Sequence, residues 1–175
     1  MVSGHLQGRT LVMFCRMIRP KRILEIGTFT GYSALCFAEG TEPDAEIHTM
    51  ERNDELEDLA QSWFDCSGFG QKITLHIGDA LDLIPRMEGL FDLVFIDADK
   101  REYIDYYEAV LPKVPSGGFV LADNTLWNGK LLEEIAQNDA QSFAISKFND
   151  YIANDSRVEK VILPLRDGLT IIYKK

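Results

Sequence analysis

The fold is decided by residues 22–33, which read Arg-Ile-Leu-Glu-Ile-Gly-Thr-Phe-Thr-Gly-Tyr-Ser. The apolar residues Ile23, Leu24 and Ile26, with the aliphatic part of Arg22, predict a short buried strand, and the residues from Tyr32 onward predict the first turns of a helix. A helix that begins at such a glycine turn brings free backbone N–H groups and the positive end of its dipole close to a ligand. The stretch fits a nucleotide-binding turn, and it fits an ordinary strand–turn–helix unit of an α/β domain equally well.

The glycine spacing separates this turn from the dinucleotide-binding fingerprint. Glu25, Gly27 and Gly31 follow the pattern Glu-x-Gly-x-x-x-Gly, which lacks the middle glycine on which a pyrophosphate rests. Because glycine has no Cβ, we expect a ligand to touch the main chain here.

Strand and helix patterns alternate along the whole chain. Further strands are predicted at residues 46–50, 73–77, 91–96 and 119–122. Helices are predicted at residues 9–19, 32–39, 54–66, 81–86, 101–111 and 130–153. This alternation predicts a parallel, doubly wound sheet, and residues 158–163 and 169–173 predict a C-terminal antiparallel hairpin. The sequence therefore predicts an α/β fold with a mostly parallel seven-stranded sheet, in a single domain over residues 1–175.

The composition narrows the class of protein. The chain has 175 residues, of which 46% are hydrophobic and 26% charged, as in an ordinary soluble globular domain. A net charge of −10 argues against non-specific nucleic-acid binding and against attraction to anionic membranes. No apolar run approaches the roughly 20 residues of a membrane span, and the first residues lack the charged start and apolar core of a signal peptide.

The cysteines indicate the cellular compartment. Cys15, Cys36 and Cys66 are odd in number, widely spaced and embedded in apolar stretches. This pattern is typical of reduced core thiols, and not of a disulfide framework or a zinc site. We therefore predict a cytoplasmic protein.

Polar residues follow the predicted strands, where ligands bind in an open α/β sheet. Glu51 lies at the end of the second strand, where a carboxylate can accept hydrogen bonds from both hydroxyls of a ribose; it is equally placed to be a surface residue before a helix cap at Asn53. Asp79 and Ala80 follow the third strand, where a carboxylate and a backbone N–H could hold an adenine edge. Asp79 could instead cap the helix that starts near Leu81.

Three hard oxygen donors, Asp97, Asp123 and Asn124, end two strands that we expect to be neighbours. Mg²⁺ prefers such ligands and keeps positions open for water and substrate oxygens. The alternatives are that Asp97 or Asp99 caps the next helix and that Asp-Asn is turn material.

Two more side chains accompany the acidic strand ends. Lys100, three residues after Asp97, could accept a proton if burial or a nearby cation lowers its pKa, or it could be a solvated lysine. Trp127 could form the wall of a site for an aromatic substrate or belong to the core. The three histidines form no ligand set.

Three motifs together resemble the cation-dependent O-methyltransferases, the caffeoyl-CoA and catechol O-methyltransferase-like enzymes that use S-adenosylmethionine. They are Leu-Glu-Ile-Gly-Thr-Phe-Thr-Gly-Tyr-Ser at 24–33, Phe-Ile-Asp-Ala-Asp-Lys at 95–100 and Asp-Asn-Thr-Leu-Trp-Asn-Gly at 123–129. The resemblance covers essentially the whole chain and implies a Rossmann-like class I methyltransferase fold.

The resemblance also implies a role for each matched residue. The residues implied to bind S-adenosylmethionine are Ser3, Glu25, Gly27 and Ser33 along its methionine portion, Asp97 and Asp99 near the amino group, Glu51 at the ribose, and Asp79 and Ala80 at the adenine. Asp97, Asp123 and Asn124 match the ligands of a divalent cation, which is Mg²⁺ or another such as Mn²⁺ or Ca²⁺. Lys100 matches the proposed base.

These residues predict an enzyme that transfers the methyl group of S-adenosylmethionine to one of two vicinal hydroxyls of a catechol-like small molecule. The cation would chelate the diol, and Lys100 would remove the proton. The resemblance implies a homodimer, and we expect no membrane partner.

Two alternatives stay open at this point. One is a tRNA hydroxyuridine O-methyltransferase, against which the net charge of −10 speaks. The other is a cofactor-binding module without a complete acceptor site, because family members carry several dozen residues before the segment that matches Ser3–His5, and this sequence starts almost at that segment.

Overall fold

The computed structural model describes residues 4–132, 135–136 and 138–175, and its centre is a seven-stranded sheet. The strands are β1 (Arg22–Ile26), β2 (Glu46–Glu51), β3 (Ile73–Ile77), β4 (Leu93–Ile96), β5 (Phe119–Asp123), β6 (Val158–Leu163) and β7 (Leu169–Lys174). They lie in the order β3-β2-β1-β4-β5-β7-β6; β1 to β5 are parallel, and β7 is antiparallel to both of its neighbours. The predicted α/β fold, with its mostly parallel sheet and terminal hairpin, is confirmed.

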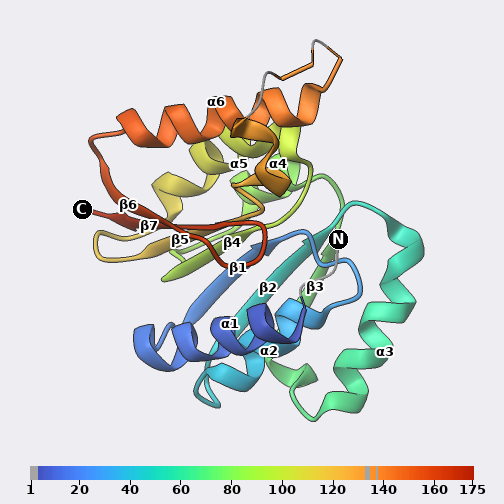
Figure 1. Cartoon of the computed structure of the whole chain (residues 1–175). Coiled ribbons are helices and arrows are strands. Elements are labelled where there is room, and N and C mark those ends of the chain that lie inside the picture. The colour runs from blue at the N-terminus through green and yellow to red at the C-terminus, as the bar shows by residue number, and fades with distance from the viewer. Residues whose placement is uncertain (1–3, 133–134, 137) are drawn as a thin grey trace.

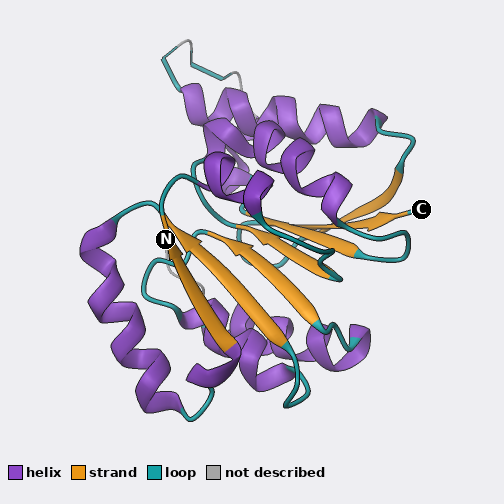
Figure 2. Ribbon diagram, turned by 180° about the vertical axis from the view of Figure 1, so that it is seen from behind, coloured by secondary structure: helices purple, strands orange, loops and turns teal. Residues whose placement is uncertain are grey.

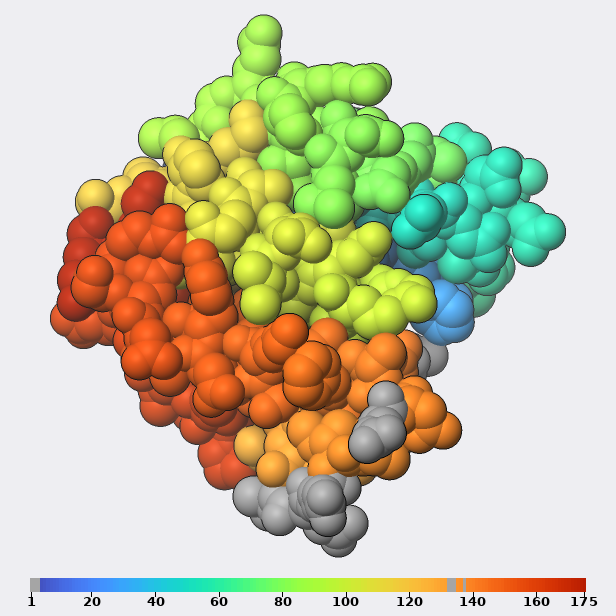
Figure 3. Space-filling model, turned by 90° about the horizontal axis from the view of Figure 1, so that it is seen from above, coloured from blue at the N-terminus to red at the C-terminus, as the bar shows by residue number. Residues whose placement is uncertain are grey.

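Helices cover both faces of the sheet (Figures 1 and 2). The helices are α1 (His5–Ile18), α2 (Tyr32–Gly40), α3 (Glu57–Ser67), α4 (Ala80–Leu83), α5 (Tyr103–Val110) and α6 (Ala140–Asn154). The first three lie on one face and the last three on the other, and Figure 3 looks onto the second group, where orange α6 lies against yellow-green α5. Because the sheet is covered twice, two hydrophobic cores form, and β1 and β4 contribute side chains to both.

One helix begins later than the sequence predicts. The helix expected from Lys130 starts at Ala140, where the Asp139 carboxylate accepts a hydrogen bond from the Ser142 amide at 3.1 Å. Before it, Asn128 and Gly129 have left-handed backbone angles, with φ of 53° and 74°, which interrupt a 3-10 segment at Trp127–Leu132. The helical periodicity of the sequence missed both the interruption and the cap.

The cysteines are only partly where they were expected. All three thiols are free, and Cys15 and Cys36 are buried, but Cys66 near the end of α3 is exposed. The prediction of a core position is therefore wrong for Cys66. In the part of the chain that is described, no helix has the length and apolarity to cross a membrane.

The sheet register brings the strand ends together. Ile26 lies opposite Met50 on β2 and opposite Ile96 on β4, and Ile96 lies opposite Ala122 on β5. The next residues of these parallel strands therefore meet at one edge of the sheet. The strand order also reverses at β1 and β4, which is where open α/β sheets form ligand sites.

Candidate active site

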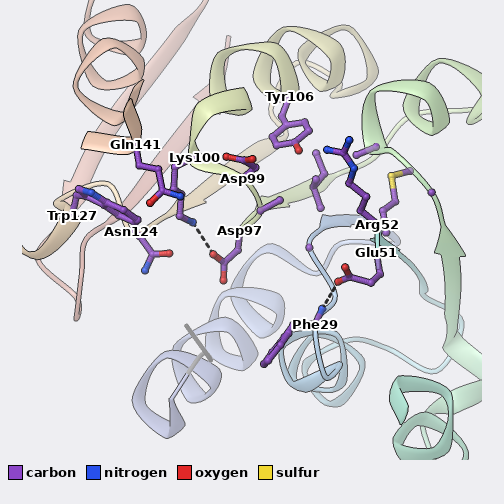
Figure 4. A pocket seen from close by; sticks show the side chains of 16 residues that line it. Phe29, Glu51, Arg52, Asp97, Asp99, Lys100, Tyr106, Asn124, Trp127 and Gln141 are labelled. Atoms are coloured by element: carbon purple, nitrogen blue, oxygen red, sulfur yellow. Dashed lines mark hydrogen bonds and ion pairs between the residues drawn. The ribbon is translucent and has the colours of Figure 1, made fainter. Parts of the chain in front are cut away.

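A cavity of about 490 Å³ opens at this edge of the sheet. Figure 4 shows Phe29, Glu51 and Arg52 on one side of it, and Lys100 and Asn124 on the other. Among the residues predicted from the sequence, those that line the cavity are Gly27, Glu51, Ala80, Asp97, Asp99, Lys100 and Asn124. Glu25, Ser33, Asp79 and Asp123 are not in its wall, and Ser3 lies outside the described residues.

The glycine turn after β1 is shaped by contacts with protein. Gly27 has φ of +98°, and a Cβ at this position would lie 2.2 Å from the backbone oxygen of Asp97; a Cβ at Gly31 would lie 2.5 Å from the Phe64 ring. The backbone amides of Gly27 and Thr28 donate to the Met50 oxygen at 2.9 and 3.1 Å. These two amides are therefore not available to a ligand, because β2 already accepts their hydrogen bonds.

A buried polar cluster supports the turn from below. The Thr49 hydroxyl donates to Glu25 Oε2 at 2.6 Å and lies 2.5 Å from the Thr28 hydroxyl. Glu25 is fully buried, and no described residue completes a hydrogen bond to its Oε1. Burial raises the pKa of Glu25 to about 8, although the neighbouring hydroxyls of Ser33 and Thr49 favour its charged form. Glu25 thus lies beneath the cavity and not in its wall.

Glu51 faces the cavity and also holds the turn. Its Oε2 accepts a hydrogen bond from the Phe29 amide at 2.8 Å, and its Oε1 accepts one from the Asn53 amide at 2.9 Å. Asn53 in turn caps the following helical segment by accepting from the Glu55 amide at 3.1 Å. Each carboxylate oxygen keeps a second lone pair, so Glu51 can still accept from a ligand.

Two of the aspartates are helix caps, as the structural alternatives predicted. Asp79 Oδ1 accepts from the Leu81 amide at 3.0 Å, and Asp99 Oδ1 accepts from the Arg101 amide at 3.0 Å. The Arg101 guanidinium also lowers the pKa of Asp99. Asp99 nevertheless lines the cavity. Asp79 does not, but the next residue, Ala80, does.

The three candidate metal ligands are Asp97, directly after β4, Asp123 at the end of β5, and Asn124 in the turn that follows β5. Asp97 and Asn124 line the cavity, and Asn124 has a left-handed φ of 59°. Asp123 is 3% exposed, and its Oδ1 accepts from the Asn124 amide at 2.9 Å. Burial and the negative charge of Asp97 raise the pKa of Asp123 to about 6.

The donor set suits a hard cation. Among the described residues, no three His, Cys, Asp or Glu side chains are grouped for metal binding; the candidates here are two carboxylates and one amide. Mg²⁺ takes few protein ligands of this kind, and a positive charge would offset the repulsion between Asp97 and Asp123. The residues therefore fit a divalent cation that keeps several positions for water and substrate.

Lys100 is buried and fixed, so the alternative of a solvated lysine is wrong. It is 6% exposed, and its Nζ lies 2.9 Å from Asp97 Oδ1 and donates to the Tyr103 hydroxyl. Tyr103 is itself buried, with its hydroxyl 3.0 Å from the backbone oxygen of Asp123. The Lys100 amine is therefore held at the cavity wall between Asp97 and Tyr103.

Sequence reasoning missed several residues of the wall, including Phe29, Arg52, Tyr106 and Gln141. Arg52 comes directly after Glu51, and its Nη2 lies 3.5 Å from Asp79 Oδ2; its position after a strand was the available signal. Gln141 comes from the first turn of α6, and no motif marks it. Trp127 lines the cavity and also packs against the core, and its role towards an aromatic substrate stays a prediction.

Known proteins resemble this chain in sequence and in fold. The model of the O-methyltransferase family matches residues 1–175. A caffeoyl-CoA O-methyltransferase of Petroselinum crispum is 34% identical over 94% of this chain and 73% of its own. The structure of the O-methyltransferase TomG from Streptomyces achromogenes in complex with SAM is 28% identical with a TM-score of 0.93, covering 99% of this chain and 82% of that one. The SAH-bound Podospora anserina methyltransferase PaMTH1 is 33% identical with a TM-score of 0.90, covering 99% and 80%.

Proposed function

The chain belongs to the O-methyltransferase family and is an S-adenosylmethionine-dependent enzyme, and from that premise we propose that it methylates one hydroxyl of a vicinal diol such as a catechol, with a divalent cation bound beside the donor. The observation that carries the proposal is that Asp97, Lys100 and Asn124 share the wall of a cavity with Glu51 (Figure 4). Carboxylates, an amine and an amide at one end of a nucleotide-type cavity suit deprotonation and methylation of a bound hydroxyl.

The cavity fits the methyl donor. Its volume of about 490 Å³ is in the range of small-molecule sites, and it runs between the ends of β1, β2 and β4. In our proposal the Glu51 carboxylate binds the ribose hydroxyls, and the segment Asp79–Ala80 borders the adenine. Gly27, Asp97 and Asp99 border the methionine portion, with Ser3, Glu25 and Ser33 contributing around or beneath it.

Asp97, Asp123 and Asn124 would hold the cation, which is Mg²⁺, Mn²⁺ or Ca²⁺. Bound there, it would supply the positive charge that lowers the pKa of a chelated hydroxyl and fixes the orientation of the diol. Lys100 Nζ then accepts the hydroxyl proton. The acceptor oxygen attacks the methyl carbon, so that a C–O bond forms as the C–S bond breaks. Trp127 lines the acceptor side of the cavity and can cover an aromatic ring.

The test is a methyl-transfer assay over catechols, flavonoids, caffeoyl thioesters and tRNA, with and without Mg²⁺. We expect transfer to vicinal diols alone, lost in excess EDTA and restored by added Mg²⁺. Turnover that persists in EDTA would refute the metal mechanism. Transfer to tRNA with no transfer to any diol would assign the acceptor to the alternative class.

A homodimer is part of the proposal, and an apolar strip of the sheet supports it. We call this the open strip; it consists of Phe119, Val161, Ile171 and Tyr173, which share the face of the sheet that α1 covers. Val161 and Tyr173 are 53% and 38% exposed, and Met17 on α1 is 74% exposed. Exposed apolar surface of this kind marks interfaces, and a second copy of the chain is the occupant we propose. The free thiols support a cytoplasmic location.

A further inference from the structure

Asp123 is held by a side chain from the other end of the sequence. Gln7 on α1 donates from its Nε2 to Asp123 Oδ2 at 2.6 Å, although the two residues are 116 positions apart. Gln7 is 2% exposed, so this hydrogen bond is shielded from water. Since Asp123 Oδ1 already accepts from the Asn124 amide, both oxygens of the carboxylate have a fixed direction.

A second residue fixes the Gln7 amide in turn. Arg166 Nη1 donates to Gln7 Oε1 at 2.9 Å from the turn between β6 and β7. An arginine can only donate hydrogen bonds, so the oxygen of the Gln7 amide must point to Arg166 and its nitrogen to Asp123. The chain Arg166–Gln7–Asp123 therefore has one possible orientation.

The chemistry of this support matters for a cation. An amide orients a carboxylate without neutralising it, whereas a lysine or arginine in direct contact would compete with the metal for Asp123. In this chain of hydrogen bonds, the Gln7 amide lies between the positive charge of Arg166 and the Asp123 carboxylate. Each oxygen of Asp123 retains a lone pair, so the carboxylate is oriented, negatively charged and open to one more partner.

We propose that Gln7 is a positioning residue that presents Asp123 to the divalent cation, with Arg166 locking the Gln7 amide. This inference rests on the proposed function, because it takes Asp123 to be a metal ligand. Partners in the second shell of a metal typically change its affinity by about 10- to 100-fold when they are removed.

The test measures Mn²⁺ binding to the whole protein by isothermal titration calorimetry, without any turnover. We expect Gln7→Leu to weaken Mn²⁺ binding by about 10-fold or more, because Asp123 loses its orienting donor. Arg166→Met should weaken it less, and the double variant should bind no more weakly than Gln7→Leu alone, since both residues act through one amide. The matched control is Tyr107→Phe, which removes another buried donor, 2.9 Å from the Asp155 carboxylate and distant from the site; its Mn²⁺ affinity should be unchanged.

Two results would overturn the inference in distinguishable ways. If the wild type binds Mn²⁺, Asp123→Ala does not, and Gln7→Leu binds like the wild type, the positioning role is wrong while the metal site stands. If Asp123→Ala binds Mn²⁺ like the wild type, the metal assignment itself fails. S-adenosylmethionine binding and the midpoint of thermal unfolding show whether each variant is folded. If Gln7→Leu does not fold, the test uses Arg166→Met, Gln7→Asn and the double variant that combines these two substitutions.

Discussion

Single side chains in this protein have their chemistry set by burial. Lys100 is almost enclosed between Asp97 and Tyr103, and Glu25 is buried beneath the glycine turn, where it accepts a hydrogen bond from the Thr49 hydroxyl. Each of these two positions leads to a prediction that can be tested.

The proposed role of Lys100 as a base can be tested separately from its positive charge. Lys100→Met should lower kcat by about 100-fold or more, the usual size of a general-base contribution, with the affinity for S-adenosylmethionine unchanged. Lys100→Arg keeps the ion pair with Asp97 but cannot release its proton, so it should be equally inactive. Steady-state kinetics and calorimetry measure the two effects. Near-normal turnover in Lys100→Arg would show that the lysine supplies only charge.

Glu25 should make stability depend on pH. Its pKa is raised from 4.5 to about 8 in the folded protein, so the folded state binds a proton more tightly than the unfolded chain. This stabilisation is fully present below about pH 4.5 and is lost as the pH rises towards about 8. The difference in unfolding free energy between the wild type and Glu25→Gln, measured by urea titration at pH 5 and pH 9, should therefore shift in favour of Glu25→Gln at pH 9. An identical pH dependence of the two proteins would contradict this assignment.

The protein atoms packed around the turn between β1 and α2 limit which side chains this turn can accept. Gly27→Ala should cost more than about 3 kcal/mol, because a left-handed residue costs about 1–2 kcal/mol and the overlap with the Asp97 backbone adds to it. Gly117→Ala is the control: Gly117 has φ of +89°, but a Cβ there meets nothing within 4 Å. It should cost about 1–2 kcal/mol. Equal losses of unfolding free energy for the two variants would mean that the backbone angle alone matters at Gly27.

The elements that sequence predicted well are those with a clear apolar period. β1, β3 and β6 have the predicted bounds, and β2 and β5 differ from them by a single residue at one end. The 3-10 segment at Trp127–Leu132 was missed because the apolar periodicity of the sequence continues through it. In the structure, left-handed residues interrupt this segment, and α6 begins only after the carboxylate cap at Asp139. Local rules describe a helix face well, but they describe the residue at which a helix begins less well.

The residues of the candidate site also divide into those that the sequence could predict and those that it could not. Asp97, Lys100 and Asn124 follow strands directly, so their place at the sheet edge followed from the fold class. Gln7 could not be found in this way, because its contact with Asp123 depends on how α1 lies on the sheet. Glu25 was identified as a site residue, but its burial depends on neighbours from β2 that no local pattern specifies.

At the scale of the whole molecule, the two faces of the sheet are covered unequally. The open strip continues the core under α1 to the edge of the sheet, and Val161 stays 53% exposed there. A lysine at this position should disrupt the proposed dimer, because its charge would be buried in an apolar contact.

The measurement is light scattering on a sizing column for the wild type, Val161→Lys and Leu59→Lys. Leu59 is 42% exposed on α3, away from the strip, so Leu59→Lys should keep the mass of the wild type. A wild type with the mass of one chain would contradict the dimer, and a dimeric Val161→Lys would place the interface elsewhere.

The position of β7 has a consequence for how the protein is made. β7 is the last strand along the sequence, but in the sheet it lies between β5 and β6. The turn before it carries Arg166, which is 159 positions from Gln7. During synthesis, the strands that border the glycine turn emerge early and can pair at once. The carboxylate of Asp123 receives its complete surroundings only after residues 166–174 have left the ribosome. A chain that stops short of β7 is therefore left with an unpaired edge at β5.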